Sequence, residues 1–244
     1  MKCPRVFTPL LCLAGLASVP VVLAQTGVTA ILPNGRAIHP LGNWIPLAPY
    51  PFALAVRPDG GQVAVPSIGF PFALNVIDNP SAANPAVKRM PEGAKKDPAV
   101  EVHAGLAYLP DGSLLYVATG DSGKVRVYRT SDLKPTGVVS LDGPIGNKIS
   151  RGSFAASVTI SADGKTLYAL DQANFRVVIL DAAKLIRLAE IPTGNYPFGL
   201  ALSPRGNRLY VANAGQMCIR DRLQGHAHAG YRLPQQLRAL HRMP

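Results

Sequence analysis

Six residues of the chain have side chains suited to binding a small polar molecule, and each lies in a loop beside a short run of apolar residues. They are His103, Asp121, Arg151, Phe154, Asp171 and Tyr196. Imidazole, carboxylate and guanidinium groups orient a ligand through hydrogen bonds, whereas aromatic rings form the apolar wall of a pocket. For the two aspartates an ordinary turn is the competing interpretation, because Asp followed by Ser-Gly or by Gln-Ala-Asn bonds readily to nearby backbone. We predict a ligand-binding site among these six residues.

No residues of the chain form a recognisable catalytic or metal-binding motif. The five histidines are scattered along the sequence: His39, His103, His226, His228 and His241. A Gly-rich phosphate loop, a pair of carboxylates at a fixed spacing and a Ser/His/Asp set are all missing from the sequence. The sequence therefore predicts a binding function without catalytic residues, bound metal or cofactor in this chain.

The elements that position the six candidates repeat along the chain. A run of small and β-branched residues, a turn that ends in glycine and a second apolar run occur four times. The turn glycines Gly60, Gly112, Gly164 and Gly206 are spaced by 52, 52 and 42 residues. Repeats of this length with short strands and turns are typical of β-propellers, in which four-stranded blades surround a central channel. The loops before the first strand and between the second and third strands then lie at one rim of the channel, and these loops contain the candidates.

The apolar runs predict strands at about 53–57, 63–66, 73–78, 104–109, 115–119, 124–129, 156–161, 167–170, 176–181, 199–203 and 208–213. Weaker fourth strands are predicted at 137–141 and 187–191, and a hairpin at 28–38 around Asn34-Gly35. Residues 43–47 are predicted to form an outer strand and the Pro-, Gly- and Ala-rich segment 79–100 a solvated loop. We therefore expect an all-β fold, an incomplete, open-arc β-propeller of three full blades and a partial fourth.

Two of the second strands carry a family signature. Tyr116-Val-Ala-Thr119 and Tyr210-Val-Ala-Asn213 resemble the Tyr-Val-Thr-Asn motif of the YVTN-repeat, or YncE-like, propellers. The turn Ser203-Pro-Arg-Gly206 is similar to the Ser-Pro-Asp-Gly turn of that family except at Arg205. The resemblance implies the fold and says little about function, because propellers host unrelated activities.

A second resemblance concerns the N-terminal part. Residues 29–36 and 51–60 resemble the start of exported two-part proteins in which a YncE-like propeller precedes a phosphoesterase domain of the alkaline phosphatase superfamily. The resemblance implies that any metal-dependent phosphoesterase chemistry lies downstream of this propeller.

The two ends are expected to lie outside the propeller. Residues 1–24 have the charged start, apolar middle and small residues before Gln25 of a secretory signal cleaved near Ala24, which predicts a periplasmic or secreted protein. Met217-Cys-Ile-Arg-Asp-Arg222 resembles translated sequencing adapter, so residues 217–244 are predicted to be a disordered or artefactual tail. The propeller then comprises residues 25–216.

The net charge of the predicted propeller is smaller than that of the whole chain. Of the formal charge of +11, the signal contributes +2 and the tail +4, which leaves +5 for residues 25–216. That balance is ordinary for a soluble domain and predicts no nucleic-acid partner, and none is expected at a membrane once the signal is cleaved.

The function predicted from the sequence is an exported binding or scaffold module, truncated from a larger protein. Its partner would be an unknown small molecule, a peptide or its own downstream domain. One alternative is the non-catalytic N-terminal propeller of a metal-dependent phosphoesterase. Another is a lactonase-like or quinoprotein-like propeller enzyme, which should have His and carboxylates at equivalent positions of several blades. His103 instead corresponds to Pro51, Ala155 and Pro197 in the other repeats.

Overall fold

The computed structural model describes residues 30–31, 33–38, 44–69, 72–91, 101–145, 148–215 and 230–232. The chain divides into two units, residues 1–45 and 46–244. The predicted signal peptide, Phe70 and most of the predicted tail, with His226, His228 and His241, lie outside the described residues. None of the residues that the structure describes is helical, and therefore none forms a helix long and apolar enough to cross a membrane.

The described part of the first unit is the hairpin predicted around Asn34-Gly35. Strands β1 (Ala30–Ile31) and β2 (Ala37–Ile38) pair antiparallel. Gly35 has a φ of +79°, which glycine adopts without steric cost, and the Asn34 side chain accepts a hydrogen bond from the Arg36 amide at 3.2 Å. Local turn chemistry is therefore sufficient to form this hairpin.

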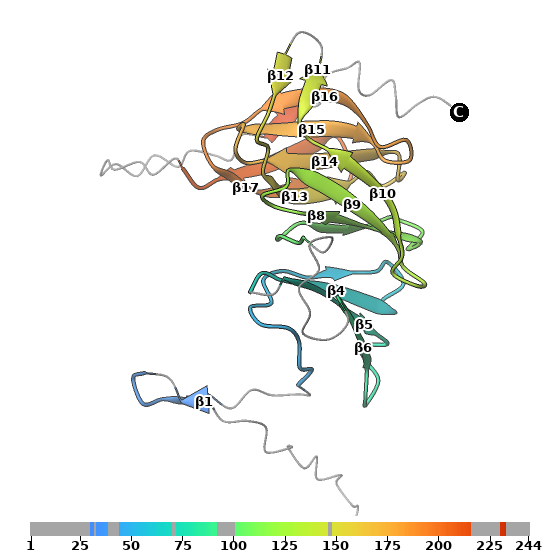
Figure 1. Ribbon diagram of the computed structural model, residues 1–244, viewed down its shortest axis with the longest axis vertical. Helices are drawn as coiled ribbons and strands as arrows, with labels where there is room; N and C mark the ends of the chain where they lie inside the picture. Colours follow the sequence, from blue (N-terminus) through green and yellow to red (C-terminus); the bar gives the residue numbers. More distant parts are fainter. Residues whose placement is uncertain are drawn as a thin grey trace, which may run out of the picture. The chain divides into compact units, whose positions relative to one another are not determined.

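The second unit consists of four successive antiparallel sheets, which we call blades 1 to 4 (Figure 1). Blade 1 comprises β3 (Ala55–Val56), β4 (Gln62–Ser67), β5 (Ala73–Asp78) and β6 (Ala86–Met90). Blade 2 comprises β7 (Leu106–Tyr108), β8 (Leu114–Ala118), β9 (Lys124–Arg129) and β10 (Pro135–Ser140). Blade 3 comprises β13 (Ala155–Ile160), β14 (Thr166–Asp171), β15 (Arg176–Asp181) and β16 (Ile186–Pro192). Blade 4 has β17 (Pro197–Leu202), β18 (Arg208–Asn213) and β19 (Gly230–Arg232). The first strand of each blade contacts the first strand of the next.

This arrangement confirms the predicted incomplete β-propeller. All eleven predicted strands and both weaker fourth strands are present, with bounds that differ from the prediction by no more than about two residues. The four turn glycines have φ values between +65° and +74°, as the predicted turns require.

Two local predictions were wrong, and one hairpin was missed. The segment 79–100 contains the outer strand β6, and residues 44–47 form no strand. The hairpin of β11 (Gly143–Ile145) and β12 (Lys148–Ser150), between blades 2 and 3, was not predicted. β6 lacks apolar alternation because it is an edge strand, held by its ladder to β5 and by the ion pair from Lys88 to Asp78 at 2.8 Å.

Three residues of the tail that was predicted to be disordered form a strand. Gly230–Arg232 form β19, which pairs antiparallel with β18 in the place of a third strand. The backbone groups along the outer edge of β18 need hydrogen-bond partners, and a strand of three residues can supply them without an apolar alternation. The prediction that the whole segment is unfolded was therefore wrong for β19.

The hydrophobic core lies between neighbouring blades. One cluster joins side chains of blade 1 to blade 2, a second joins blade 2 to blade 3, and a third joins blade 3 to blade 4. Its buried members are mainly Val, Leu, Ile, Ala and Tyr, and it contains no described Phe. Each blade is thus stabilised by its neighbours.

Buried polar side chains also connect the blades. The Tyr108 hydroxyl of blade 2 donates to Gln62 Oε1 of blade 1 at 3.0 Å, and Gln62 Nε2 donates to the Thr130 carbonyl at 3.3 Å. Burial raises the pKa of Tyr108, so its hydroxyl remains a donor at all physiological pH values. In the next interface the Tyr116 hydroxyl donates to the Ala182 carbonyl at 3.1 Å.

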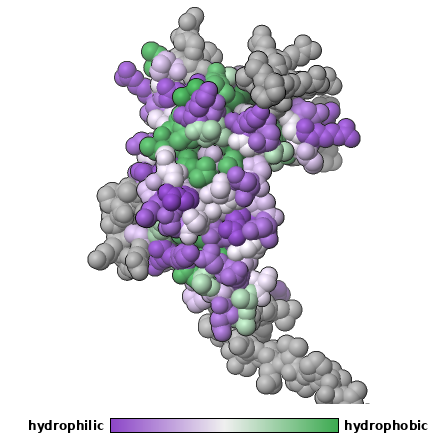
Figure 2. Space-filling model, turned by 90° about the vertical axis from the view of Figure 1, so that its right-hand side faces the viewer, coloured by the Kyte–Doolittle hydropathy of each residue, from purple (hydrophilic) through white to green (hydrophobic). Residues whose placement is uncertain are grey.

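Blade 1 exposes residues that its sister blades cover. Leu54 is 66% exposed, whereas Val158, at the equivalent position of blade 3, is 5% exposed. Val56 is 53% exposed, whereas its equivalent Tyr108 is 6% exposed. Another face of the molecule also shows hydrophobic residues reaching the surface among hydrophilic ones (Figure 2).

We expect residues 25–216, expressed alone, to self-associate, because burying these side chains against another molecule removes apolar surface from water. Size-exclusion chromatography with light scattering should show oligomers, and a Leu54→Lys, Val56→Lys double variant should shift the population towards monomer. A concentration-independent monomer of the unmodified chain would contradict the prediction.

Candidate functional site

His103 lies at the entrance of the first strand of blade 2 and is fixed by two hydrogen bonds. Its backbone amide donates to the Ala118 carbonyl at 2.8 Å. Its Nδ1 lies 3.0 Å from the carbonyl oxygen of Ala156 in blade 3. A carbonyl oxygen only accepts hydrogen bonds, so Nδ1 carries a hydrogen and Nε2 of the neutral ring has a free lone pair. The packing of two blades thereby selects the tautomer of His103.

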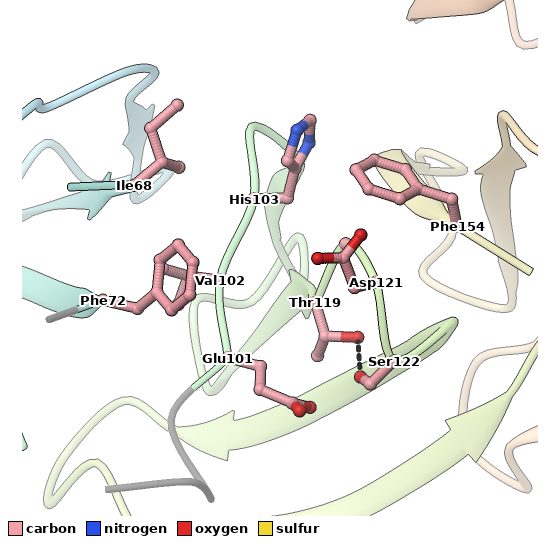
Figure 3. Close-up of a pocket in the computed structure, with 10 residues that line it drawn as sticks. Ile68, Phe72, Glu101, Val102, His103, Thr119, Asp121, Ser122 and Phe154 are labelled. Carbon is pink, nitrogen blue, oxygen red and sulfur yellow. Dashed lines mark hydrogen bonds between the residues drawn. The ribbon is translucent and has the colours of Figure 1, made fainter. Parts of the chain in front are cut away.

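A pocket of about 130 Å³ lies beside this ring, at the rim predicted from the sequence (Figure 3). The loop between β4 and β5 of blade 1 supplies Ile68 and Phe72 on one side. Phe154, just before β13, stands on the opposite side, and blade 2 supplies the remaining residues. Polar groups of one blade therefore meet apolar walls from its two neighbours, which is a common composition of small-molecule sites.

The polar groups of the pocket come from two segments of blade 2. Glu101 and His103 precede β7, and Thr119, Asp121 and Ser122 follow β8. The Thr119 and Ser122 hydroxyls lie 2.7 Å apart, and Thr119 Oγ1 also donates to the Lys124 carbonyl at 2.8 Å. These contacts hold the β8–β9 loop so that Asp121 remains exposed at the pocket.

Gly120 makes the tight turn that carries Asp121. Its φ is +69°, in the left-handed region that favours glycine. A Cβ at this position would lie 3.5 Å from His103 Cβ and 3.5 Å from the tip of the Phe154 ring. The backbone of the loop therefore lies within ordinary van der Waals range of His103 and Phe154.

Glu101 has a carboxylate that is only partly satisfied. Its Oε2 makes no hydrogen bond among the described residues and lies 3.8 Å from Arg126 Nη2. The Glu101 side chain is 35% exposed. Although Oε2 is buried, the side chain as a whole is partly exposed, and its carboxylate keeps unused capacity to accept hydrogen bonds.

Four rings, one from each blade, meet next to the pocket. The His103 ring centroid lies 4.8 Å from that of Phe154, 6.1 Å from that of Phe52 and 6.5 Å from that of Phe198. Phe52 and Phe198 are 6.1 Å apart in an edge-to-face arrangement. Such pairs are favourable beyond the area that they bury. We call these four residues the ring cluster.

The ring cluster includes two residues that were not among the six candidates, Phe52 and Phe198. Both follow a Tyr-Pro pair, at Tyr50-Pro51 and Tyr196-Pro197, and this repeated tripeptide was the signal that could have identified them. Every described Phe, which adds Phe72 and Phe175 to the three in the ring cluster, lies in a rim loop or at the start of a first strand. The described Phe residues are thus placed at the rim, whereas the buried aromatic residues of the core are tyrosines.

The structure brings together three of the six predicted site residues. His103, Asp121 and Phe154 line the pocket, and Asp171, Arg151 and Tyr196 do not. Asp171 is fully buried, and its oxygens accept hydrogen bonds from Ser153 Oγ at 2.8 Å, the Phe154 amide at 3.1 Å and Arg176 Nε at 2.9 Å. Asp171 therefore positions the loop that carries Phe154 and has a structural role, and it also accepts the turn hydrogen bond from Asn174 Nδ2 at 2.9 Å.

Arg151 and Tyr196 lie elsewhere on the rim. Arg151 is exposed, and its carbonyl accepts a hydrogen bond from Asn174 Nδ2 at 3.3 Å. Tyr196 is 60% exposed, has a φ of +49°, and packs edge-on against Phe175 at 5.6 Å. The residues that the structure describes include no group of three or more His, Cys, Asp or Glu side chains that could hold a metal ion.

Comparisons with known proteins agree with this architecture. The family model for the seven-bladed lactonase β-propeller matches residues 103–220, just under half of the chain. The chain is an incomplete β-propeller. No curated protein matches the sequence.

Solved structures of similar fold include the hydrazine synthase of Kuenenia stuttgartiensis, with 22% identity, a TM-score of 0.53, and coverage of 72% of this chain and 46% of that chain. A protein from Lactobacillus plantarum has 19% identity and a TM-score of 0.55, with coverage of 77% and 57%. A protein from Bacteroides uniformis, provisionally assigned as a 6-phosphogluconolactonase, has 20% identity and a TM-score of 0.54, with coverage of 76% and 56%. The chain spans about half the length of these proteins, and the likeness concerns their fold.

Proposed function

We propose that these blades belong to a lactonase-like propeller and that the pocket beside His103 binds a cyclic ester. The observation that carries the proposal is the meeting of His103, Glu101 and Asp121 in one pocket between three blades. The family match, which begins at residue 103, supports the same choice. The proposal takes up the lactonase-like alternative in place of the non-catalytic scaffold.

The chemistry required is modest. Opening a lactone needs a water molecule that attacks the ester carbonyl, a base that takes the proton of this water, and a proton for the ring oxygen that leaves as an alcohol. In neutral His103, Nε2 accepts a proton while Nδ1 remains bonded to the Ala156 carbonyl. The proton can then pass from Nε2 to the leaving oxygen, so that His103 ends the cycle in its starting form. The exposed carboxylate of Asp121 in the same pocket stabilises the imidazolium that forms in between.

The test is ring opening of δ-valerolactone and glucono-δ-lactone by the full chain, followed by proton NMR against the spontaneous reaction. His103→Gln should lower kcat/KM by about 100-fold, the usual contribution of a general base. Arg151→Gln is the matched control, because Arg151 is an exposed cation of the same rim outside the pocket. Thermal unfolding of each variant checks that the loss of the bond to Ala156 has not unfolded the blades.

A binding module is the second candidate, and the ring cluster favours it. Phe52 and Phe198 are 47% and 43% exposed, which is unusual for Phe and typical of a surface that contacts a ligand. Saturation-transfer NMR with the same lactones separates the two functions. Binding without ring opening, equal in the wild type and His103→Gln, would contradict the lactonase proposal and support the binding module.

A further inference from the structure

The charged residues that line the pocket indicate which ligands it can bind. Two of its lining residues, Glu101 and Asp121, are acidic, and no Lys or Arg is among the described residues that line it. Arg126 Nη2 lies 3.8 Å from Glu101 Oε2 and offsets that one carboxylate. The charge of Asp121 has no such partner in the pocket, so a bound anion would meet a net negative surface.

The apolar walls of the pocket also restrict the ligands that it can bind. Ile68 and Phe72 form one side, opposite Phe154, with Val102 between them and His103 (Figure 3). Phe72 is 43% exposed, although a Phe with no ligand would be more stable buried. A ligand whose ester lies at His103 and Asp121 would direct its other substituents towards Ile68 and Phe72.

We propose that this pocket selects uncharged cyclic esters with an apolar substituent and rejects phosphorylated ones. The inference rests on the proposed function, and it narrows the substrate class. Phosphate recognition normally uses Arg or Lys side chains or the amide groups of a helix N-terminus. None of these is present among the described residues of the pocket. The apolar substituent would gain free energy by covering the exposed ring of Phe72.

The first experiment compares three probes by saturation-transfer NMR on the full chain at mildly acidic pH, where lactones open slowly. They are δ-decalactone, glucono-δ-lactone, and the freshly prepared 6-phosphate ester of glucono-δ-lactone. We expect the phosphate ester to bind at least about tenfold more weakly than its uncharged counterpart, since its negative charge is repelled by the carboxylate of Asp121. Equal or tighter binding of the phosphate ester would overturn the inference. If none of the three probes binds, the proposed function itself fails.

Variants that change the charge or the shape of the pocket test which residues cause this selectivity. Asp121→Asn keeps the size of the side chain and should narrow the ratio between the affinities for glucono-δ-lactone and for its phosphate ester. Phe72→Ala should weaken binding of δ-decalactone about tenfold more than it weakens binding of glucono-δ-lactone. Phe175→Ala is the matched control, because Phe175 is a similarly exposed rim Phe that packs on Tyr196 away from the pocket. Discrimination that survives Asp121→Asn, or a loss of δ-decalactone binding in both Phe variants, would contradict the assignment.

Discussion

Replacing Arg176 by Met will lower the free energy of unfolding by about 3–5 kcal/mol, the usual cost of breaking a buried ion pair by removing one partner. Arg176 is 4% exposed and donates to Asp171 at 2.9 Å and to Glu190 at 2.5 Å. Its Nη2 also donates to the Leu141 carbonyl of the preceding blade at 2.8 Å. The variant leaves the carboxylate of Asp171 buried without its cation, so the loss exceeds that of a single hydrogen bond.

Urea denaturation of the full chain, followed by circular dichroism, measures this effect. Arg129→Met is the control, because Arg129 pairs with Asp132 at 3.4 Å on the surface and its side chain is 53% exposed. An exposed pair of this kind contributes less than about 1 kcal/mol. Equal stabilities of the Arg176 and Arg129 variants would show that the buried network does not hold blade 3 to blade 2.

A second large effect is expected at Gly105, which directly precedes β7, the first strand of blade 2. A Cβ at this position would lie 2.5 Å from Ser157 Cα and 2.6 Å from the backbone nitrogen of Val158. Both atoms belong to the backbone of β13 in the next blade, so no side chain can move aside. Gly105→Ala should therefore push blades 2 and 3 apart and lower the free energy of unfolding by about 1–3 kcal/mol, the range for overpacking a core.

The repeat supplies the matched control for this variant. Gly199 occupies the equivalent position of blade 4, and a Cβ there would meet only the Ala212 side chain at an ordinary 3.6 Å. Gly199→Ala should leave the stability within about 0.5 kcal/mol of the wild type. Thermal unfolding of the two variants side by side checks the prediction. A Gly105→Ala variant that melts with the wild type would mean that the first strands are not packed as closely as described.

Features that depend on a few neighbouring residues could be predicted from the sequence. The strand β9 has the predicted bounds because Lys124, Arg126 and their apolar neighbours alternate with the period of a strand that has one wet face. β6 could not be found in this way. Its residues lie at the edge of a blade, are mostly exposed, and are held by backbone pairing to β5, which no side-chain pattern records.

The candidate site was predictable in part. His103, Asp121 and Phe154 were found because rim loops follow from the repeat, and the repeat is visible in the sequence. Asp171 takes the place of Thr119 in the 52-residue repeat, at the end of the second strand, and it is buried by Ser153 and Arg176. Asp121 lies two positions further into its loop and remains exposed at the pocket, so the residue type alone did not distinguish a pocket residue from a structural one.

The sequence by itself determined the all-β class, the repeat of blades and the rim at which polar and aromatic residues gather, because turns and strand alternation are local properties of the chain. Only the tertiary structure decided that rings from four different blades meet at His103, and that the Ala156 carbonyl of one blade selects the tautomer of a histidine in another. It also placed two carboxylates, and no Lys or Arg of the described residues, in the lining of the pocket. These contacts join residues that are dozens of positions apart, and their distances are set by the packing of whole blades against each other.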